Sequence, residues 1–294
     1  MDLTTLPKKL FHKLRGYGKL VMFSHTVFSL SFAAVALLTA SGGRPDPRVV
    51  LWAAVAFLSA RTGANALNRA VDAKIDARNP RTAGRQIPKG EVGVAETVLF
   101  TLACFAVMVF AAFRLNPLCA LLSPVALFLM TVYSYTKRFT WLCHLVLGVT
   151  CACAPAGAWL AVTGQFSWEV FLLGGANCLW TAGFDIIYGA QDYEFDRAHG
   201  LYSMPVRFGV AGALGISTLF HAGALACLIG FGLLQHPPLG GLYALALAII
   251  AVLMAVQHRM VSPDRLEHVE IASYSVSQIT SVVLLILGVL DVYL

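Results

Sequence analysis

The chain contains few charged residues for its length. Only 12% of its 294 residues are Asp, Glu, Lys or Arg, whereas a soluble domain carries about 25%. So little charge cannot cover a water-soluble surface. Together with 58% hydrophobic residues and a mean hydropathy of +0.74, it indicates a polytopic membrane protein. The same composition excludes a disordered chain, a collagen, a coiled coil and a small disulfide scaffold.

The seven cysteines lack the CxxC spacing of a structural zinc or redox site. All of them fall within apolar runs, where a free cysteine behaves as a small buried hydrophobe. The amino-terminal region also lacks the small-residue cleavage site of a secretory signal peptide. We therefore expect the first apolar run to be retained as a membrane span.

Nine apolar runs have a length close to the roughly 20 residues that a helix needs to cross a membrane. Continuous runs, without alternation of period two, favour helices over a β-barrel. The sequence therefore predicts an all-α polytopic membrane protein, with one transmembrane domain over residues 1–294. The expected spans are 20–40, 49–69, 93–113, 116–136, 140–163, 166–190, 209–235, 238–258 and 270–293.

Basic residues are distributed unevenly between the two ends of these spans. The amino terminus and the odd-numbered connections hold 17 Lys and Arg residues, and the other connections hold 3. The positive-inside rule then places the amino terminus, with a basic segment over 1–19, in the cytoplasm. Since no compact basic domain remains, nucleic-acid binding is not expected. We expect an integral membrane protein whose basic connections face the cytoplasm.

A first acidic motif lies at the expected cytoplasmic end of the second span. Asn68, Asp72 and Asp76 follow one another at intervals of four residues. On a helix this spacing places all three side chains on one face, and Arg61 lies on the same face one heptad earlier.

A second acidic motif ends the sixth span. Its members, which also share one helical face, are Asp185, Tyr188, Asp192 and Asp196. Asp192 and Asp196 each follow their counterparts in the first motif by 120 residues. Such a constant separation is what a duplicated four-helix half would leave.

Carboxylates at this depth are costly, about 2.5–3.5 kcal/mol each near the membrane centre, unless a partner satisfies them. Paired carboxylates offer the hard oxygen ligands that Mg²⁺ prefers, and Mg²⁺ often joins carboxylates to phosphate oxygens. Basic residues follow the first motif at 78, 81, 85 and 89, and others end the fourth span at 137 and 138. The mixture predicts a site for a metal-bridged di- or triphosphate.

Two other interpretations fit the same residues. A single aspartate at a helix end is usually solvated, and basic residues at a membrane boundary usually set the topology. A cation-coupled secondary transporter also carries intramembrane acids and internal repeats. Because both motifs lie at helix ends on one side, and not at the midplane, an enzyme is favoured.

The two motifs resemble the aspartate-rich motifs of the UbiA superfamily of intramembrane aromatic prenyltransferases. Segments 81–90 and 133–140 are similar to that family's basic loop and its tyrosine-lysine-arginine segment. One departure is Arg69, which cannot bind a metal and stands where the family has an aspartate after Asn68. Residues 68–83 look most like the 4-hydroxybenzoate polyprenyltransferase-like branch, part of which is assigned to menaquinone synthesis by the futalosine route.

The resemblance implies a UbiA-type bundle that transfers a polyprenyl group from a polyprenyl diphosphate to a carboxylated hydroxy-aromatic acceptor, of the 4-hydroxybenzoate or dihydroxynaphthoate type. The products would serve ubiquinone or menaquinone synthesis, and other acceptors within the superfamily stay open. The implied cofactor is Mg²⁺, with ligands Asn68, Asp72, Asp76, Asp192 and Asp196. The implied diphosphate ligands are Arg81, Arg85, Tyr133 and Lys137.

Three residues are expected to act on the acceptor. Asp185, one turn deeper than the metal pair and close to Tyr188, is the candidate base. Arg61 lies seven residues, about 10 Å, deeper than Asn68. Its planar guanidinium suits the acceptor carboxylate, although pairing with an acid or with carbonyls between helices is the structural alternative. The role of His25, in the first span, stays open between a functional and a neutral hydrogen-bonded histidine.

Overall fold

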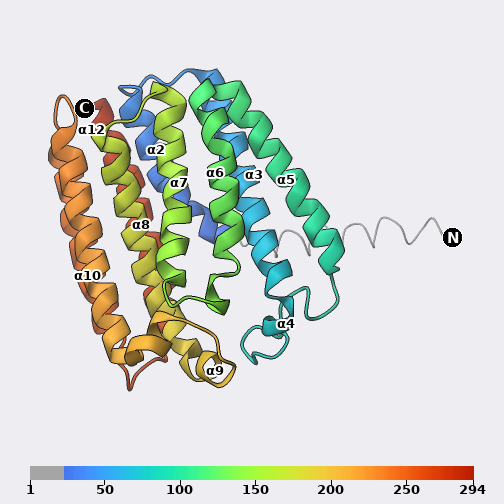
Figure 1. The fold of residues 1–294 in the computed structure, drawn as a ribbon. Coiled ribbons are helices and arrows are strands. Elements are labelled where there is room, and N and C mark those ends of the chain that lie inside the picture. The colour runs from blue at the N-terminus through green and yellow to red at the C-terminus, as the bar shows by residue number, and fades with distance from the viewer. Residues whose placement is uncertain (1–22) are drawn as a thin grey trace, which may run out of the picture.

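The computed structural model describes the backbone of residues 23–294 and the side chains from residue 28 onward. The basic segment 1–19 and the side chain of His25 lie outside this part of the chain. Within it, the protein is helical and forms no β-strand. The long helices are α2 (Phe23–Ala40), α3 (Pro47–Val71), α5 (Val94–Leu115), α6 (Pro117–Tyr133), α7 (Cys143–Thr163), α8 (Trp168–Gly189), α10 (Met204–Leu234), α11 (Gly241–Arg259) and α12 (Val276–Tyr293) (Figure 1).

Seven helices in residues 23–294 are long and apolar enough to cross a membrane. They are α3, α5, α7, α8 with its continuation α9 (Tyr193–Ala198), α10, α11, and α12 with the preceding π-helical segment η3 (Ile271–Ser275). The described part of α2 and the 17-residue α6 are shorter apolar helices. The structure confirms an all-helical membrane protein, while the count of nine spans and their orientation stay predictions.

Local sequence signals explain several helix ends. Asp46 caps α3, where its side chain accepts a hydrogen bond from the backbone N–H of Arg48 at 2.8 Å. Asn116 caps α6 in the same way, and a proline occupies the first helical position after each cap. In α10, Gly209 has a φ of 71° and kinks the helix. The expected span start at 209 coincides with this kink, five residues after the helix begins.

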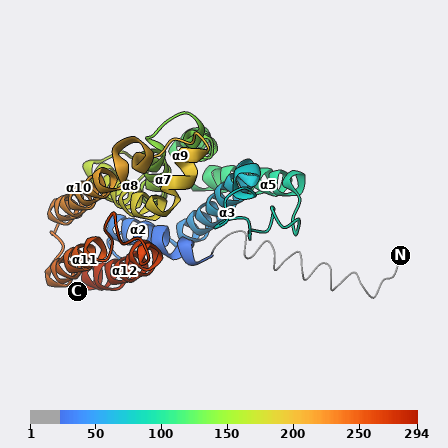
Figure 2. The same cartoon turned by 90° about the horizontal axis from the view of Figure 1, so that it is seen from below.

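The helices pack in a bundle with an apolar outer surface. Helix α8 packs against α7 and α10, α3 packs against α5, and α2 lies between α7 and α12 (Figure 2). A core of large side chains, including Phe32, Trp180 and Phe231, is fully buried. Other large apolar side chains, such as Leu99 and Leu121, are about 70% exposed, at 69% and 73%. An outer surface of this kind suits contact with lipid chains.

The two acidic motifs lie at the same end of the bundle. The short helices α4 (Ala73–Asp76) and α9 lie at the lower end in Figure 1, while the carboxyl terminus lies at the upper end. The connections from α2 to α3 and from α7 to α8 are also at the upper end. The functional groups predicted from the sequence are therefore gathered at one end of the fold.

Candidate active site

Each acidic motif is built around the same break between a long helix and a short one. Helix α3 ends at Val71, and Asp72 then begins α4 with backbone angles φ −87° and ψ 2°. In the second motif, the short segment η2 (Ala190–Asp192) follows α8, and Asp192 begins α9 with φ −94° and ψ 4°. The predicted continuous helical faces are interrupted at these turns. The matching geometry supports the predicted repeat.

In the first motif, each aspartate contacts an arginine. Asp72 Oδ1 accepts a hydrogen bond from Arg138 Nη2 at 2.9 Å, and Asp72 Oδ2 accepts one from Asn68 Nδ2 at 3.1 Å. Asp76 Oδ1 accepts a hydrogen bond from Arg85 Nη1 at 2.6 Å. Asn68 therefore orients the carboxylate of Asp72, in addition to any contact that it makes with a ligand.

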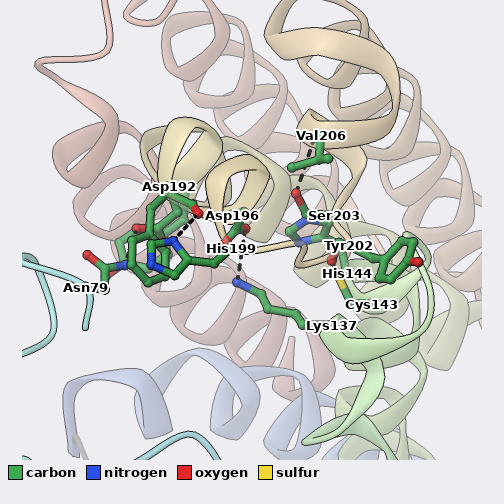
Figure 3. Close-up of polar contacts among 12 residues, drawn as sticks. Asn79, Lys137, Cys143, His144, Asp192, Asp196, His199, Tyr202, Ser203 and Val206 are labelled. Carbon is green, nitrogen blue, oxygen red and sulfur yellow. Dashed lines mark hydrogen bonds and ion pairs between the residues drawn. The ribbon is translucent and has the colours of Figure 1, made fainter. Parts of the chain in front are cut away.

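The second motif is paired in the same way, with basic residues from outside its own helix. Asp192 accepts two hydrogen bonds from Arg81, from Nε at 2.9 Å and from Nη2 at 2.5 Å, and a third from Asn79 Nδ2 at 3.1 Å. Lys137 Nζ points toward Asp196 and lies 3.8 Å from its Oδ2 atom (Figure 3). The four aspartates predicted as metal ligands, Asp72, Asp76, Asp192 and Asp196, are thus each paired with a cation.

The surroundings keep Arg81 and Lys137, the two basic partners of the second motif, charged. Burial lowers the pKa of Arg81, but its hydrogen bonds and attraction to Asp192 outweigh this effect and raise the pKa overall. Burial likewise lowers the pKa of Lys137, and the carboxylate of Asp196 more than compensates, so that this pKa also rises. Both side chains therefore remain cations throughout the physiological range.

The oxygen donors of the two acidic motifs fit Mg²⁺. In the described part of the chain, no three His, Cys, Asp or Glu side chains converge closely enough to hold a metal, and the motif carboxylates are paired with basic groups. Each motif nevertheless presents one buried carboxylate oxygen without a hydrogen bond, Asp76 Oδ2 and Asp196 Oδ2. Hard oxygens that lack hydrogen bonds in a phosphate-binding environment are suited to Mg²⁺.

The two candidate acceptor-side residues of α8 have different partners. Tyr188 accepts a hydrogen bond from Arg81 Nη1 at 2.6 Å, and its ring lies 4.6 Å from that of Tyr274 in η3. Asp185 instead contacts α7, where its Oδ2 atom lies 2.7 Å from His144 Nδ1. Tyr188 therefore belongs with the basic cluster, while Asp185 is held separately, one turn deeper.

A cavity of about 910 Å³ connects these residues with the opposite end of the bundle. All twelve of the predicted site residues line it, from Arg61 to Asp196, and so does Arg69. Beyond the charged end its walls are mainly apolar and include Leu37, Phe57 and Leu160. The site therefore combines a polar mouth with a long apolar chamber.

Arg61 lies deeper in this cavity than the acidic motifs. Its Nη1 atom is 3.9 Å from Cys151 Sγ. Arg61 also lines a small adjoining pocket of about 20 Å³, together with Thr181, Ser277 and Gln278. The sequence prediction that Arg61 shares the site with the motifs, but at a greater depth, agrees with this position.

Four polar residues of the site were not among the predicted set. Asn79 and Arg138 contact the aspartates, Tyr274 packs on Tyr188, and His144 contacts Asp185. Arg138 follows Lys137 directly, so the basic segment at 137 and 138 already indicated that it lies near the site. His144 and Tyr274 lie in apolar stretches far along the chain, and only the packing of α7 and η3 against α8 brings them to the site.

Comparisons with known proteins define the family. Residues 29–277 match the UbiA prenyltransferase family, and the chain belongs to it. The 4-hydroxybenzoate octaprenyltransferases of Shewanella amazonensis and Vibrio campbellii are 31% and 29% identical to it, and the matches cover 86% and 85% of this chain and 87% and 88% of theirs.

Solved structures agree with this assignment. A UbiA homologue from Aeropyrum pernix has a TM-score of 0.80 and 32% identity, over 88% of this chain and 95% of that one. A UbiA homologue from Archaeoglobus fulgidus, solved with GPP and Mg²⁺, has a TM-score of 0.72 at 18% identity, over 95% of this chain and all (100%) of that one, and shows the same fold. The protein is therefore an integral membrane protein of the prenyltransferase class.

Proposed function

We propose that the protein transfers a polyprenyl group from an allylic diphosphate to a carboxylated hydroxy-aromatic acceptor, in a reaction that depends on Mg²⁺. One observation carries the proposal: four aspartates, each paired with a cation, gather at the mouth of a long apolar cavity. This arrangement matches the two parts of a prenyl diphosphate. The charged mouth suits the diphosphate, and the chamber suits the hydrocarbon tail.

The basic residues bind the diphosphate oxygens. Arg81 and Arg85 present planar forks that match phosphate oxygens, and Lys137 adds a compact charge. Tyr133 lines the same part of the cavity and can donate its hydroxyl hydrogen. The motif aspartates hold these cations at the mouth of the cavity, and the cations exchange the carboxylates for phosphate oxygens when the diphosphate and the metal bind.

The aspartates of both motifs would hold Mg²⁺. Asp72 and Asp76 supply oxygens from one side, Asp192 and Asp196 supply them from the other, and Asn68 orients Asp72. When bound, the metal would neutralise charge on the departing pyrophosphate. The solved UbiA homologue with GPP and Mg²⁺ supports the binding of a prenyl diphosphate together with Mg²⁺. Arg69 contributes no metal ligand, so the first motif relies on the other three residues.

The chemistry joins two carbons at the polar end of the chamber. The allylic carbon–oxygen bond breaks, and its electron pair leaves with pyrophosphate. The ring carbon ortho to the acceptor hydroxyl forms the new carbon–carbon bond. Asp185, which lines the cavity one turn deeper than Tyr188, takes the ring proton that this bond displaces. The aromatic ring is then restored.

Arg61 binds the carboxylate of the acceptor. Its depth of about two helical turns beyond Asn68 separates it from the diphosphate site and places it beside the region where the acceptor ring must lie. A bidentate pair with a carboxylate fixes both the position and the plane of the ring.

The relatives named 4-hydroxybenzoate octaprenyltransferase support an acceptor of the 4-hydroxybenzoate type and a role in ubiquinone synthesis. The alternative, a dihydroxynaphthoate acceptor and a role in menaquinone synthesis, rests on the resemblance of residues 68–83. The basic loops beside the site support a place in the bacterial inner membrane with the site facing the cytoplasm. We also propose that residues 1–294 form one transmembrane domain and that the basic segment 1–19 lies in the cytoplasm.

Pyrophosphate release tests the proposal against the transporter alternative. Purified protein in detergent is incubated with geranyl diphosphate and Mg²⁺, with and without 4-hydroxybenzoate or a dihydroxynaphthoate. We expect pyrophosphate release that requires both the metal and one of the aromatic acids. Absence of release with either acid, combined with cation-driven uptake into proteoliposomes, would support a transporter instead.

A further inference from the structure

His144 lies at the start of α7, directly beside the carboxyl group of Asp185 on α8. Only 1% of His144 is exposed, and its Nδ1 atom lies 2.7 Å from Asp185 Oδ2. The Asp185 side chain is 25% exposed and lines the cavity. Both residues line the cavity, but the imidazole is almost fully buried, whereas the carboxyl group is partly exposed to the chamber.

The contact determines which atom of the ring carries hydrogen. A carboxylate oxygen can only accept a hydrogen bond, so His144 Nδ1 must be the protonated donor. The bond is charge-assisted, which makes it shorter and stronger than a neutral one. It fixes one oxygen of Asp185, while the exposed part of the carboxyl group remains toward the cavity.

The neighbouring turn of α8 packs closely against the ring. A Cβ atom on Gly189 would lie 2.8 Å from His144 Cε1, closer than side chains approach one another in proteins. The absence of a side chain at Gly189 thus lets the imidazole approach α8 this closely. The ring is confined between α7 and α8, with its donor aimed at Asp185.

We infer that His144 is a positioning residue for Asp185, an inference that rests on the proposed function. By donating from Nδ1, it holds the carboxylate in the rotamer that presents an oxygen to the acceptor ring. When the new carbon–carbon bond forms, the ring proton passes to that oxygen. The protonated carboxyl group then releases the proton to water after the product leaves.

Two amide substitutions distinguish this role from simple packing. The side-chain amide nitrogen of asparagine can occupy the position of His144 Nδ1 and donate to Asp185. The amide nitrogen of glutamine instead reaches the position of Nε2, where it cannot replace that hydrogen bond. We expect His144→Asn to retain kcat within about threefold, and His144→Gln to lower it about tenfold or more, the size of one hydrogen bond to a charged group. The KM for geranyl diphosphate should stay unchanged in both. Equal kcat values for the two variants would overturn the inference.

A double-mutant cycle separates this inference from the proposed function. Asp185→Asn alone should lower kcat about 100-fold or more, as loss of a general base does. If His144 acts only through Asp185, adding His144→Gln to Asp185→Asn should cause little further loss. Full additivity would overturn the positioning role. If Asp185→Asn retains normal kcat, the assignment of Asp185 as the base fails.

A spectroscopic readout tests the contact without turnover. In protein labelled with ¹⁵N-histidine, the His144 signals are identified by their absence from the His144→Gln spectrum. We expect a protonated Nδ1 whose signal shifts in Asp185→Asn. An unprotonated Nδ1, or a signal that Asp185→Asn leaves unchanged, would contradict the hydrogen bond on which the inference depends.

Discussion

Arg81 and Asp192, which are 111 residues apart in the chain, are joined by two parallel hydrogen bonds at the mouth of the cavity. The arginine comes from the loop after the first acidic motif, and the aspartate belongs to the second. The pair therefore connects the two halves of the site. When the two residues separate, a metal ion can replace Arg81 as the partner of Asp192. A phosphate group can in turn replace Asp192 as the partner of Arg81.

This exchange predicts that Mg²⁺ and prenyl diphosphate bind cooperatively. Mg²⁺ on the aspartates frees the basic groups, which then bind phosphate oxygens. We expect Mg²⁺ to increase the affinity for geranyl diphosphate by at least about tenfold in calorimetric titrations, within the usual range of coupling between sites. Asp192→Asn should reduce this increase. Equal affinities with and without Mg²⁺ in the unaltered protein would argue against the exchange.

Substitution of the motif aspartates should abolish turnover without unfolding the protein. We expect Asp72→Asn, Asp76→Asn, Asp192→Asn and Asp196→Asn each to reduce prenyl transfer at limiting Mg²⁺ by about 100-fold or more, because each removes an anionic ligand. Glu194→Gln is the matched control, since Glu194 is an exposed acid in α9, the short helix that also holds Asp196. Near-normal rates in two of the aspartate variants would exclude the proposed metal site.

Substitutions of Arg61 and Arg85 should change the KM values of different substrates. Lysine cannot reproduce the two parallel bonds of a guanidinium with a carboxylate. We expect Arg61→Lys to raise the KM for the aromatic acid about tenfold, an effect of roughly 1.4 kcal/mol, and to change the KM for the prenyl diphosphate little. Arg85→Lys should show the opposite pattern. If Arg61→Lys shifts only the prenyl diphosphate KM, Arg61 does not bind the acceptor.

The membrane topology can be tested with reporters. Because the site and the carboxyl terminus lie at opposite ends of the bundle (Figure 1), a carboxyl-terminal reporter should be extracytoplasmic. Single cysteines near Lys89 and Arg265, introduced after replacement of the seven native ones, should be labelled only from the cytoplasmic side. A carboxyl terminus on the cytoplasmic side would put the site on the other side of the membrane and contradict the proposed orientation.

The sequence predicted the helical class and most of the site because both depend on simple patterns. Apolar runs of about 20 residues marked the helices, and aspartates spaced by four marked the motifs. The helical face was a good approximation although Asp72 and Asp192 lie at turns. Each turn is followed at once by another helical segment, so the side chains continue to point into the cavity.

The partners of those residues could not be predicted in the same way. Arg138 and Lys137 are adjacent in sequence, yet one contacts the first motif and the other contacts the second. His144 is one polar residue within an apolar helix, and its role depends on a contact with a residue 41 positions away. Such contacts follow from the packing of α7 against α8, which local spacing does not encode.

Mass spectrometry of the reaction product tests the central claim most directly. Purified protein is supplied with geranyl diphosphate, Mg²⁺ and either 4-hydroxybenzoate or a dihydroxynaphthoate. The account predicts a product in which one geranyl group has replaced one ring hydrogen, with the carboxyl group retained, and predicts its loss in Asp76→Asn. Consumption of the diphosphate without a carbon–carbon bond to either acid, or equal product from Asp76→Asn, would contradict it.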